Sequence, residues 1–394
     1  MTRLFLIAGE PSGDRLGAAL LEGLRTLEGP ALEVDGIGGP AMAAEGLVSR
    51  FPMEELSVMG LAEVLPRLPG ILRRVRETAA AVIEAEPDAL ITIDSPDFGL
   101  RVARRVRAAR PELRTIHYVA PQVWAWRPGR ARKMAEVIDH VLALLPFEPP
   151  YMEAAGMTCE FVGHPVVAMA RASEAEKAAL RAVLGFGDDP VIALLPGSRR
   201  GEVARHGPIF SETFARLRRV RPNLQAVIAA TAPVVDLVRE TIPDASVLDP
   251  RDMPDSEAQM WKRAAFATAD VALAVSGTVS LELAAQGTPM VIAYQANPVS
   301  AAIARRLVRV DTATLVNLVT GRRAVPEFIF ERCQPRMIAP ALARILDDPE
   351  DAAEQLAAGE EAMRRLGRDD EPPGLRAARS VLAAIERPRL ARRG

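Results

Sequence analysis

Short apolar runs alternate with helical stretches along this chain, and the whole alternation occurs twice. Most of the runs are followed by glycine, proline, serine or aspartate, which is typical of buried parallel strands. Strands that are joined in this way by helices form parallel sheets with helices on both faces. The first series of predicted strands comprises 4–8, 89–93, 115–119, 141–145 and 159–162, and the second comprises 191–195, 224–230, 271–275 and 290–294.

The stretch between the two series predicts a domain boundary. Residues 167–184 form a charged, alanine-rich helical pattern, and a chain of 394 residues is long enough for two cores. We therefore expect an α/β protein with two doubly wound, Rossmann-like domains, 1–168 and 169–365, facing each other across a cleft. The charged C-terminal helices are expected to pack back across both domains, with 366–394 returning to the first.

The composition excludes several classes of protein. The net charge is −2, which gives no support to nucleic-acid binding. Cys159 and Cys333 form no C-x-x-C pair, so neither a disulfide framework nor a cysteine-rich metal site is indicated. The chain has no run of about eighteen apolar residues, and its first apolar run is too short for a signal peptide. We expect a cytoplasmic protein that can still lie against a membrane.

The turn after strand 191–195 combines the features of an anion site. Gly197, Ser198 and Arg199 lie between that strand and a helix predicted over 203–220. The free N–H groups at a helix start, beside a guanidinium group, favour a phosphate or diphosphate. The alternative is an ordinary turn with solvated arginines. The turn matches neither the P-loop nor the dinucleotide-binding pattern.

A loop predicted over 9–14 follows the first strand and precedes a helix predicted over 15–27. Its glycines would let the backbone approach a ligand at the end of a strand. The alternative is a capped turn with Asp14 near a helix start. The candidate residues of this loop are Glu10, Ser12, Gly13 and Asp14.

Asp94 follows strand 89–93 directly, and Asp97 comes three residues later. Open parallel sheets bind their ligands at the carboxyl ends of strands. Asp94 is therefore a candidate general base, whereas Asp97 is interpreted as the N-cap of the next helix.

Two of the three tryptophans, Trp124 and Trp126, lie in the loop after strand 115–119. Because aromatic residues make up only 4% of the chain, this clustering favours a binding surface for sugar or acyl groups, with packing against the next helix as the alternative. His117 and His140 lie in or beside apolar strands and are interpreted as hydrogen-bonded core residues.

A Ser-Gly-Thr turn follows strand 271–275, and the next helix holds Glu282 in its first turn. The turn can hold a phosphate, and Glu282 can accept hydrogen bonds from the two hydroxyls of a ribose. Alternatively, Glu282 only interacts with the helix dipole. The sequence contains no D-x-D pair, no H-E-x-x-H and no G-x-S-x-G serine, so metal catalysis and Ser-His hydrolysis lose their usual support.

The stretch 56–72 carries an apolar helical stripe that Pro66, Pro69 and Gly70 interrupt, with arginines close by. An apolar face beside arginines can lie in an anionic membrane interface. A buried stripe with solvated arginines is the alternative.

Taken together, these motifs resemble those of the lipid-A-disaccharide synthases, inverting glycosyltransferases of the two-Rossmann-domain (GT-B) type. The resemblance covers almost the whole chain in the right order, and its most distinctive block runs from His117 to Trp126. The matching blocks are A-G-E-P-S-G-D at 8–14, E-E-L-S-V-M-G at 54–60, I-D-S-P-D-F at 93–98, I-H-Y-V-A-P-Q-V-W-A-W-R at 116–127, L-P-F-E at 145–148, F-V-G-H-P at 161–165, L-L-P-G-S-R at 194–199, S-G-T at 276–278, N-L at 317–318 and C-Q-P at 333–335.

The resemblance implies a reaction and roles for residues. A 2,3-diacylglucosamine passes from UDP to 2,3-diacylglucosamine-1-phosphate, giving the β-1′,6-linked lipid A disaccharide and UDP, with no metal or other cofactor. Asp94 would deprotonate the acceptor hydroxyl, and Arg199 would stabilise the diphosphate. The N-terminal domain would then serve the acceptor and the membrane, and the C-terminal domain the UDP-sugar. Further donor contacts would come from Gly197, Ser198, Ser276, Gly277, Thr278, Glu282, Asn317 and Gln334, and acceptor contacts from the loops with Glu10, Ser12, Gly13, Asp14, Trp124 and Trp126.

Because both substrates carry acyl chains, the resemblance also favours a membrane-facing or acyl-binding patch at the inner membrane, formed by Val58, Met59, Leu61 and Val64. A homodimer is a further expectation. The alternatives are another UDP-N-acetylglucosamine-using protein of this fold and a non-catalytic sugar-nucleotide-binding protein. An NAD-dependent dehydrogenase is disfavoured by the missing G-x-G-x-x-G.

Overall fold

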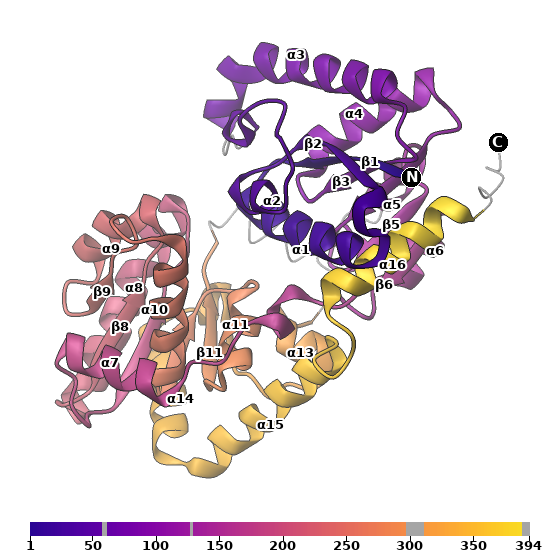
Figure 1. Ribbon diagram of the computed structural model, residues 1–394. Coiled ribbons are helices and arrows are strands. Elements are labelled where there is room, and N and C mark those ends of the chain that lie inside the picture. Colours follow the sequence, from indigo (N-terminus) through magenta and orange to yellow (C-terminus); the bar gives the residue numbers. More distant parts are fainter. Residues whose placement is uncertain (57–60, 127–128, 297–310, 388–394) are drawn as a thin grey trace. The chain divides into compact units, whose positions relative to one another are not determined.

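The computed structural model contains two parallel sheets of six strands, each flanked by helices (Figure 1). It describes residues 1–56, 61–126, 129–296 and 311–387, with only the backbone described over 61–67. The chain divides into two compact units, of which the first is Met1–Ala168 with Leu366–Gly394 and the second is Met169–Arg365. The predicted α/β class with two Rossmann-like sheets is confirmed.

The first sheet has the strand order β2-β1-β3-β4-β5-β6, and all its strands are parallel. Its central strands are apolar and buried, whereas the edge strand β2 is mostly half-buried and carries Glu33 and Asp35. That mixed pattern is why β2 was absent from the predicted strands. The strands are β1 (Thr2–Ala8), β2 (Leu32–Ile37), β3 (Ala89–Ile93), β4 (Arg114–Tyr118), β5 (His140–Ala143) and β6 (Thr158–Phe161).

Helices cover both faces of this sheet (Figure 1). Successive strand residues point to opposite faces, so Leu4 and Leu6 pack in the core that includes α1 and α16, whereas Phe5 and Ile7 pack in the core that includes α3 and α4. The helices of the first unit are α1 (Pro11–Glu28), α2 (Pro40–Ala44), α3 (Leu61–Ala85), α4 (Pro96–Ala109), α5 (Gly129–Ala135), α6 (Pro149–Glu153) and α16 (Pro373–Glu386).

The second sheet has the order β12-β11-β10-β7-β8-β9 and is also parallel. Its strands are β7 (Val191–Leu195), β8 (Gln225–Ala229), β9 (Ser246–Leu248), β10 (Val271–Ala274), β11 (Met290–Tyr294) and β12 (Glu327–Ile329). The helices around it are α7 (Glu174–Leu184), α8 (Arg200–Val220), α9 (Val235–Thr241), α10 (Asp255–Thr268), α11 (Val279–Gln286), α13 (Leu315–Thr320), α14 (Pro335–Asp347) and α15 (Pro349–Arg365).

Local signals explain where several helices begin and end. Ser173 and Glu176 form a reciprocal capping box at the start of α7, and Gly185 ends that helix with φ +68°. α1 begins at Pro11 rather than at residue 15, because proline at the first helical position has a preset φ and no N–H to satisfy. The predicted loop 9–14 is therefore wrong beyond Glu10.

Helix α3 runs without a break from Leu61 to Ala85, although the sequence predicted an interrupted stripe at Pro66, Pro69 and Gly70. A proline removes one backbone hydrogen bond and bends a helix, but packing can hold the helix together. Val75 and Val82, both buried, anchor its second half. Within the described part of the chain, no helix is both long and apolar enough to cross a membrane.

The C-terminal helix α16 packs against α1 at a pair of glycines. A Cβ atom at Gly23 would lie 2.5 Å from the carbonyl oxygen of Gly374, and one at Gly374 would overlap the carbonyl oxygen of Ala19. The helix is also hydrogen-bonded to the sheet, because Ser380 Oγ lies 2.8 Å from His140 Nε2 and donates to Glu160 at 2.7 Å. This segment is therefore an integral part of the first unit.

We expect Gly374→Ala to lower the free energy of unfolding by about 1–3 kcal/mol, because the added methyl group overlaps backbone that cannot move aside cheaply. Gly70→Ala is the matched control. Its Cβ would have nothing within 4 Å, so it should stabilise α3 by about 0.5–1 kcal/mol. Denaturant unfolding of both variants checks this, and equal effects would contradict the close packing of α1 and α16.

Candidate active site

Three strands of the first sheet end in register at one edge. Ala8 of β1 pairs with Ile93 of β3, which pairs with Tyr118 of β4. Asp94, the residue after β3, donates its backbone N–H to the carbonyl of Tyr118 at 2.9 Å. The side chain predicted as a general base is thus held at the carboxyl edge of the sheet, where open α/β folds bind ligands.

Asp94 and Ser95 form a sharp turn in the left-handed region, with φ of +51° and +39°. Two consecutive non-glycine residues in this region cost of order 1–3 kcal/mol each, and such strain concentrates at functional sites. The turn lets α4 start at Pro96. Asp94 remains half-buried.

The first turn of α1 orients the Asp94 carboxylate. Ser12 Oγ donates to Asp94 Oδ2 at 2.9 Å, and the N–H of Ser95 donates to Oδ1 at 2.9 Å. Gly13 brings α1 close, since a Cβ there would lie 3.1 Å from the carbonyl oxygen of Ile93. The structure therefore brings Ser12 and Gly13 to Asp94, but on a helix and not on the predicted loop.

The side chain of Asp14 does not approach Asp94 as Ser12 does, but binds backbone N–H groups. Its side chain is 3% exposed and accepts hydrogen bonds from the backbone N–H groups of Gly39, Ala41 and Met42 at 2.8–3.0 Å. It therefore caps the start of α2 and fixes α2 to α1. The prediction that Asp14 faces a ligand is corrected, and Glu10 remains at the N-cap of α1.

The two tryptophans of the loop after β4 differ in environment. Trp124 is buried, with its ring edge-to-face against Phe147 at 5.2 Å between centroids and its Nε1 donating to Glu148 at 3.2 Å. Trp126 is half-buried and lies under the guanidinium group of Arg130, 5.1 Å from the ring centroid. The packing alternative therefore holds for Trp124, and the surface prediction applies only to Trp126.

Glu148 is a buried carboxyl group to which the sequence analysis gave no role. It is 3% exposed and accepts hydrogen bonds from the N–H groups of Leu144 and Leu145 at 3.2 and 3.0 Å. Burial raises its pKa to about 7, although these donors and Trp124 act in the opposite direction. The only sequence signal for Glu148 is the L-P-F-E block at 145–148.

The raised pKa of Glu148 predicts a pH dependence of stability. Between pH 4.5 and about pH 7, Glu148 keeps its proton in the folded protein but has lost it in the unfolded chain. The stability that this difference contributes is therefore complete below pH 4.5 and is lost as the pH rises to about 7. Glu148→Gln cannot ionise. The variant should lose a constant amount of stability at every pH, because one hydrogen-bond acceptor is missing. Relative to wild type, its free energy of unfolding should then rise by about 2–3 kcal/mol between pH 4.5 and about pH 7. Glu153→Gln is an exposed control, and parallel urea-unfolding profiles for Glu148→Gln and wild type would contradict the prediction.

The histidines predicted as core residues are confirmed as such. His117 Nδ1 lies 2.7 Å from Thr92 Oγ1, and His140 Nδ1 lies 2.7 Å from Thr158 Oγ1. Burial lowers the pKa of each to about 4, so both are neutral at pH 7.

In the second unit, the turn before α8 is already occupied by a carboxylate. Glu202 Oε2 accepts from the N–H groups of Ser198 and Arg199 at 3.1 and 3.3 Å. Gly197 has φ +127°, and a Cβ there would lie 2.5 Å from the Glu202 side chain. The helix-start amides predicted to bind a phosphate are thus hydrogen-bonded to Glu202.

The guanidinium group of Arg199 remains available. Its side chain is 66% exposed, and its pairing with Glu202 at 3.3 Å is an exposed contact. Such exposed pairs contribute only about 0–1 kcal/mol, so Glu202 holds Arg199 only weakly.

The Ser-Gly-Thr turn follows β10 at the carboxyl edge of the second sheet. Ser276 Oγ donates to the carbonyl of Ala313 at 2.8 Å, and a Cβ at Gly277 would meet nothing within 4 Å. Thr278 is the N-cap residue of α11. Glu282 is half-buried and pairs with Lys262 of α10 at 2.5 Å, a partner that the sequence analysis missed.

Asn317 is 2% exposed. Its Nδ2 donates to the carbonyl of Val325 at 2.9 Å and its Oδ1 accepts from the N–H of Val325 at 3.0 Å, and Nδ2 also donates to Thr312 and Glu327 at 3.3 and 3.4 Å. A direct donor contact by Asn317 is therefore corrected to a positioning role. Glu327 Oε1 accepts from the N–H groups of Ala313 and Thr314 at 3.1 and 2.7 Å, and so anchors the segment that Ser276 contacts.

Gln334 is half-buried at the N-cap of α14. Its Nε2 donates to the carbonyl of Glu331 at 2.6 Å, and its Oε1 accepts from Arg336 at 2.8 Å. Its side chain is thus engaged within its own turn.

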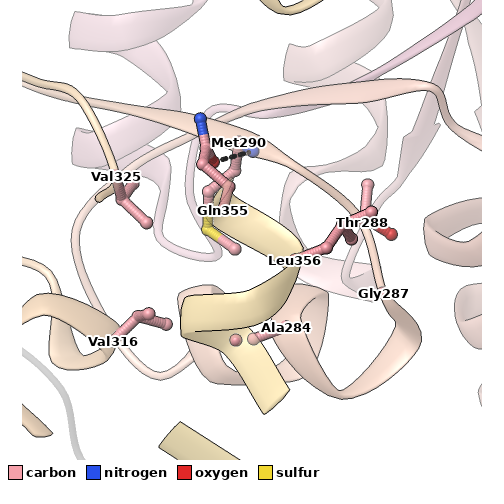
Figure 2. A pocket seen from close by; sticks show the side chains of 9 residues that line it. Ala284, Gly287, Thr288, Met290, Val316, Val325, Gln355 and Leu356 are labelled. Carbon is pink, nitrogen blue, oxygen red and sulfur yellow. Dashed lines mark hydrogen bonds between the residues drawn. The ribbon is translucent and has the colours of Figure 1, made fainter. Parts of the chain in front are cut away.

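A small pocket lies at the opposite edge of the second sheet, between the C-terminal end of α11 and α15. Figure 2 shows Gln355 across it, with Oε1 accepting from the N–H of Met290 at 2.9 Å. Its volume of about 10 Å³ has room for no more than a water molecule. It is a packing defect and not a substrate site.

The predicted membrane patch is described only in part. Val58 and Met59 lie outside the described residues, and Leu61 and Val64 are described only as backbone in the first turns of α3. Further along the same helix, Leu68 and Leu72 are 36% and 37% exposed.

Comparison with known proteins gives a consistent result. A family model described as Lipid-A-disaccharide synthetase matches residues 4–372. A lipid-A-disaccharide synthase of Ruegeria pomeroyi is 58% identical over 97% of this chain and 95% of its own length, and one of Rhodospirillum centenum is 48% identical over 97% and 94%.

Solved structures with low sequence identity share the fold. A Staphylococcus aureus MnaA–UDP structure superposes with a TM-score of 0.65 at 13% identity, covering 95% of this chain and 94% of that one. A UDP-GlcNAc 2-epimerase of Neisseria meningitidis bound to UDP-GlcNAc has a TM-score of 0.62 at 12% identity, covering 97% and 99%. These likenesses show the two-Rossmann-domain architecture, and the family match selects among the proteins that use it.

Proposed function

Since the chain belongs to the lipid-A-disaccharide synthase family, we propose that its first unit activates the acceptor and its second unit binds the UDP-sugar. The protein is a glycosyltransferase that condenses UDP-diacylglucosamine with diacylglucosamine-1-phosphate. The family match separates this reaction from those of other UDP-sugar proteins of the same fold.

Asp94 is the proposed general base. Its carboxylate takes the proton of the acceptor's primary hydroxyl, the oxygen attacks the anomeric carbon, and the bond to the diphosphate breaks with release of UDP. The observation that carries this role is the strained turn at Asp94 and Ser95, which fixes the carboxylate at the sheet edge with one oxygen on Ser12. A positioned base contributes about 10²–10⁴-fold to rate.

Arg199 is the proposed stabiliser of the leaving diphosphate. Negative charge grows on the diphosphate as the glycosidic bond breaks, and an exposed guanidinium can bind it through two parallel hydrogen bonds. Glu202 holds the arginine near its working position until the donor arrives.

The rest of the donor site is proposed at the turn from Ser276 to Thr278. The open space at Gly277 lets a ligand approach the backbone. Glu282, which pairs with Lys262, would hold the ribose hydroxyls. Asn317 and Gln334 would act by positioning the segments around this turn.

The proposal includes inversion at the anomeric carbon without a metal ion, since attack opposite to UDP turns an α-linked donor into a β-linked product. The sequence offers no D-x-D pair to hold a metal at the diphosphate. The coupling constant of the new anomeric proton, measured by NMR on the product, tests this. A β linkage supports single displacement, and an α linkage would overturn it.

We further propose that the protein acts at the inner-membrane surface, where acylated substrates reside, through Val58, Met59, Leu61 and Val64. Changing all four to serine should abolish flotation with phosphatidylglycerol vesicles. Val183→Ser with Val220→Ser is the control, since those side chains are 68% and 71% exposed elsewhere. Unchanged flotation of the fourfold variant would reject the patch. The expected homodimer is tested by analytical ultracentrifugation.

A further inference from the structure

A solvent-accessible pocket of about 290 Å³ lies in the first unit, away from the contacts of Asp94 described above. It is formed by the loop after β4, by α5 and by α6. Its lining is apolar apart from Arg132 and the hydroxyl of Tyr151. The lining includes Val123, Ala131, Arg132, Tyr151, Ala154 and Ala155.

The pocket is built from two connections that follow neighbouring strands of the first sheet. Val123 belongs to the loop that follows β4, and α6 begins six residues after the end of β5. These strands pair in parallel register with each other and with β3, which Asp94 follows. The residues that directly follow these three strands come to the same edge. The pocket is lined by the connections that follow β4 and β5 and lead back to the starts of β5 and β6.

The chemistry of the pocket combines apolar walls with a cationic rim. Tyr151 is 46% exposed, and Ala154 is also exposed, so apolar surface faces solvent here. Arg132 belongs to α5, whose sequence GRARKMA has three basic residues and no acidic one. Among the described residues, no hydrogen bond or ion pair involves Arg132. An apolar cavity with an unpaired cation at its mouth matches an acyl chain attached to an anionic head group.

We propose that this pocket holds one acyl chain of the phosphorylated acceptor, and that Arg132 meets the acceptor's phosphate at the rim. The inference rests on the proposed function, because the first unit is there assigned to the acceptor. The acceptor fits better than the UDP-linked donor, since its phosphate is on the sugar itself and its hydroxyl must reach Asp94 in the same unit.

A substitution that fills the pocket tests whether the pocket binds an acyl chain. Each buried methylene is worth up to about fourfold in affinity, so Ala154→Trp should raise the KM for the long-chain acceptor about tenfold or more. The kcat and the donor KM should stay close to wild type. An acceptor with acetyl groups in place of the long chains should react equally well with both proteins. Glu153→Trp, on the same helix but outside the lining, is the matched control.

The rim is tested separately by Arg132→Gln. We expect a rise of about tenfold in the KM for the 1-phosphate acceptor, and no change for an acceptor that lacks the phosphate. Lys133→Gln is the control, since Lys133 is an exposed cation on the same helix outside the lining.

The outcomes are distinguishable. An unchanged acceptor KM in Ala154→Trp would overturn the proposed acyl-chain site, and so would an equal rise in KM for short-chain and long-chain acceptors. Either result would leave the transferase assignment intact. An altered oligomeric state with an unchanged acceptor KM would show that a second copy of the chain occupies the pocket, and would also overturn the proposal. No disaccharide from the wild-type protein would overturn the proposed function, and with it this inference.

Discussion

Asp94→Asn is expected to lower kcat by about 10²–10⁴-fold while the affinity for the UDP-sugar stays within about twofold of wild type. Asparagine keeps the size of the side chain and can still accept from Ser12, but it cannot take a proton from the acceptor hydroxyl. The loss therefore falls on the chemical step and not on donor binding. Steady-state kinetics and calorimetric titration of UDP measure the two parts.

Asp97→Asn is the matched control for this variant. Asp97 is exposed in the first turn of α4, three residues from Asp94, and its loss should change kcat by less than about twofold. Ser12→Ala should have an intermediate effect, because it frees the Asp94 carboxylate without removing it. Near-normal turnover in Asp94→Asn, or an equal loss in Asp97→Asn, would contradict the assignment of the base.

Arg199→Ala is expected to lower kcat/KM for the UDP-sugar by about 10²–10³-fold, with both kcat and KM affected. The guanidinium binds the diphosphate in the ground state and more strongly as charge develops on it. Removal of Arg199 also leaves Glu202 at the turn without its cationic partner, which adds repulsion toward the diphosphate. Initial-rate kinetics over a range of donor concentrations separates the two parameters.

Arg200→Ala controls for simple loss of positive charge, since Arg200 is the exposed neighbour of Arg199 at the start of α8. It should cost less than about threefold in kcat/KM. Arg199→Lys should recover only part of the activity, because lysine lacks the planar fork that binds two phosphate oxygens. Equal losses in Arg199→Ala and Arg200→Ala would show that only the local charge matters.

The central architecture could be predicted because buried parallel strands leave a strong pattern. β3, β7 and β10 are buried along their whole length and almost entirely apolar, and the residues that follow them mark the carboxyl edge of each sheet. Among the edge strands, only β6 was predicted. β2, β9 and β12 consist largely of half-buried positions, so their pairing depends on neighbours that are distant in sequence.

The position of Asp94 after a buried strand could be predicted, but its hydrogen bonds could not. Asp94 follows from its place after a strand, but its bond to Ser12 joins residues that are 82 positions apart. Glu148 and Lys262 have no local signature, because their importance comes from burial and from one partner each. Asn317 was predicted to contact the donor, but its amide is hydrogen-bonded to the backbone of Val325.

The most direct test of the central claim is the reaction itself. Purified protein is mixed with UDP-diacylglucosamine and diacylglucosamine-1-phosphate in the presence of EDTA, and UDP and lipid products are measured together. We predict equal molar amounts of UDP and of a β-linked tetra-acylated disaccharide phosphate. UDP binding without disaccharide, or UDP release that does not depend on the acceptor, would contradict the account.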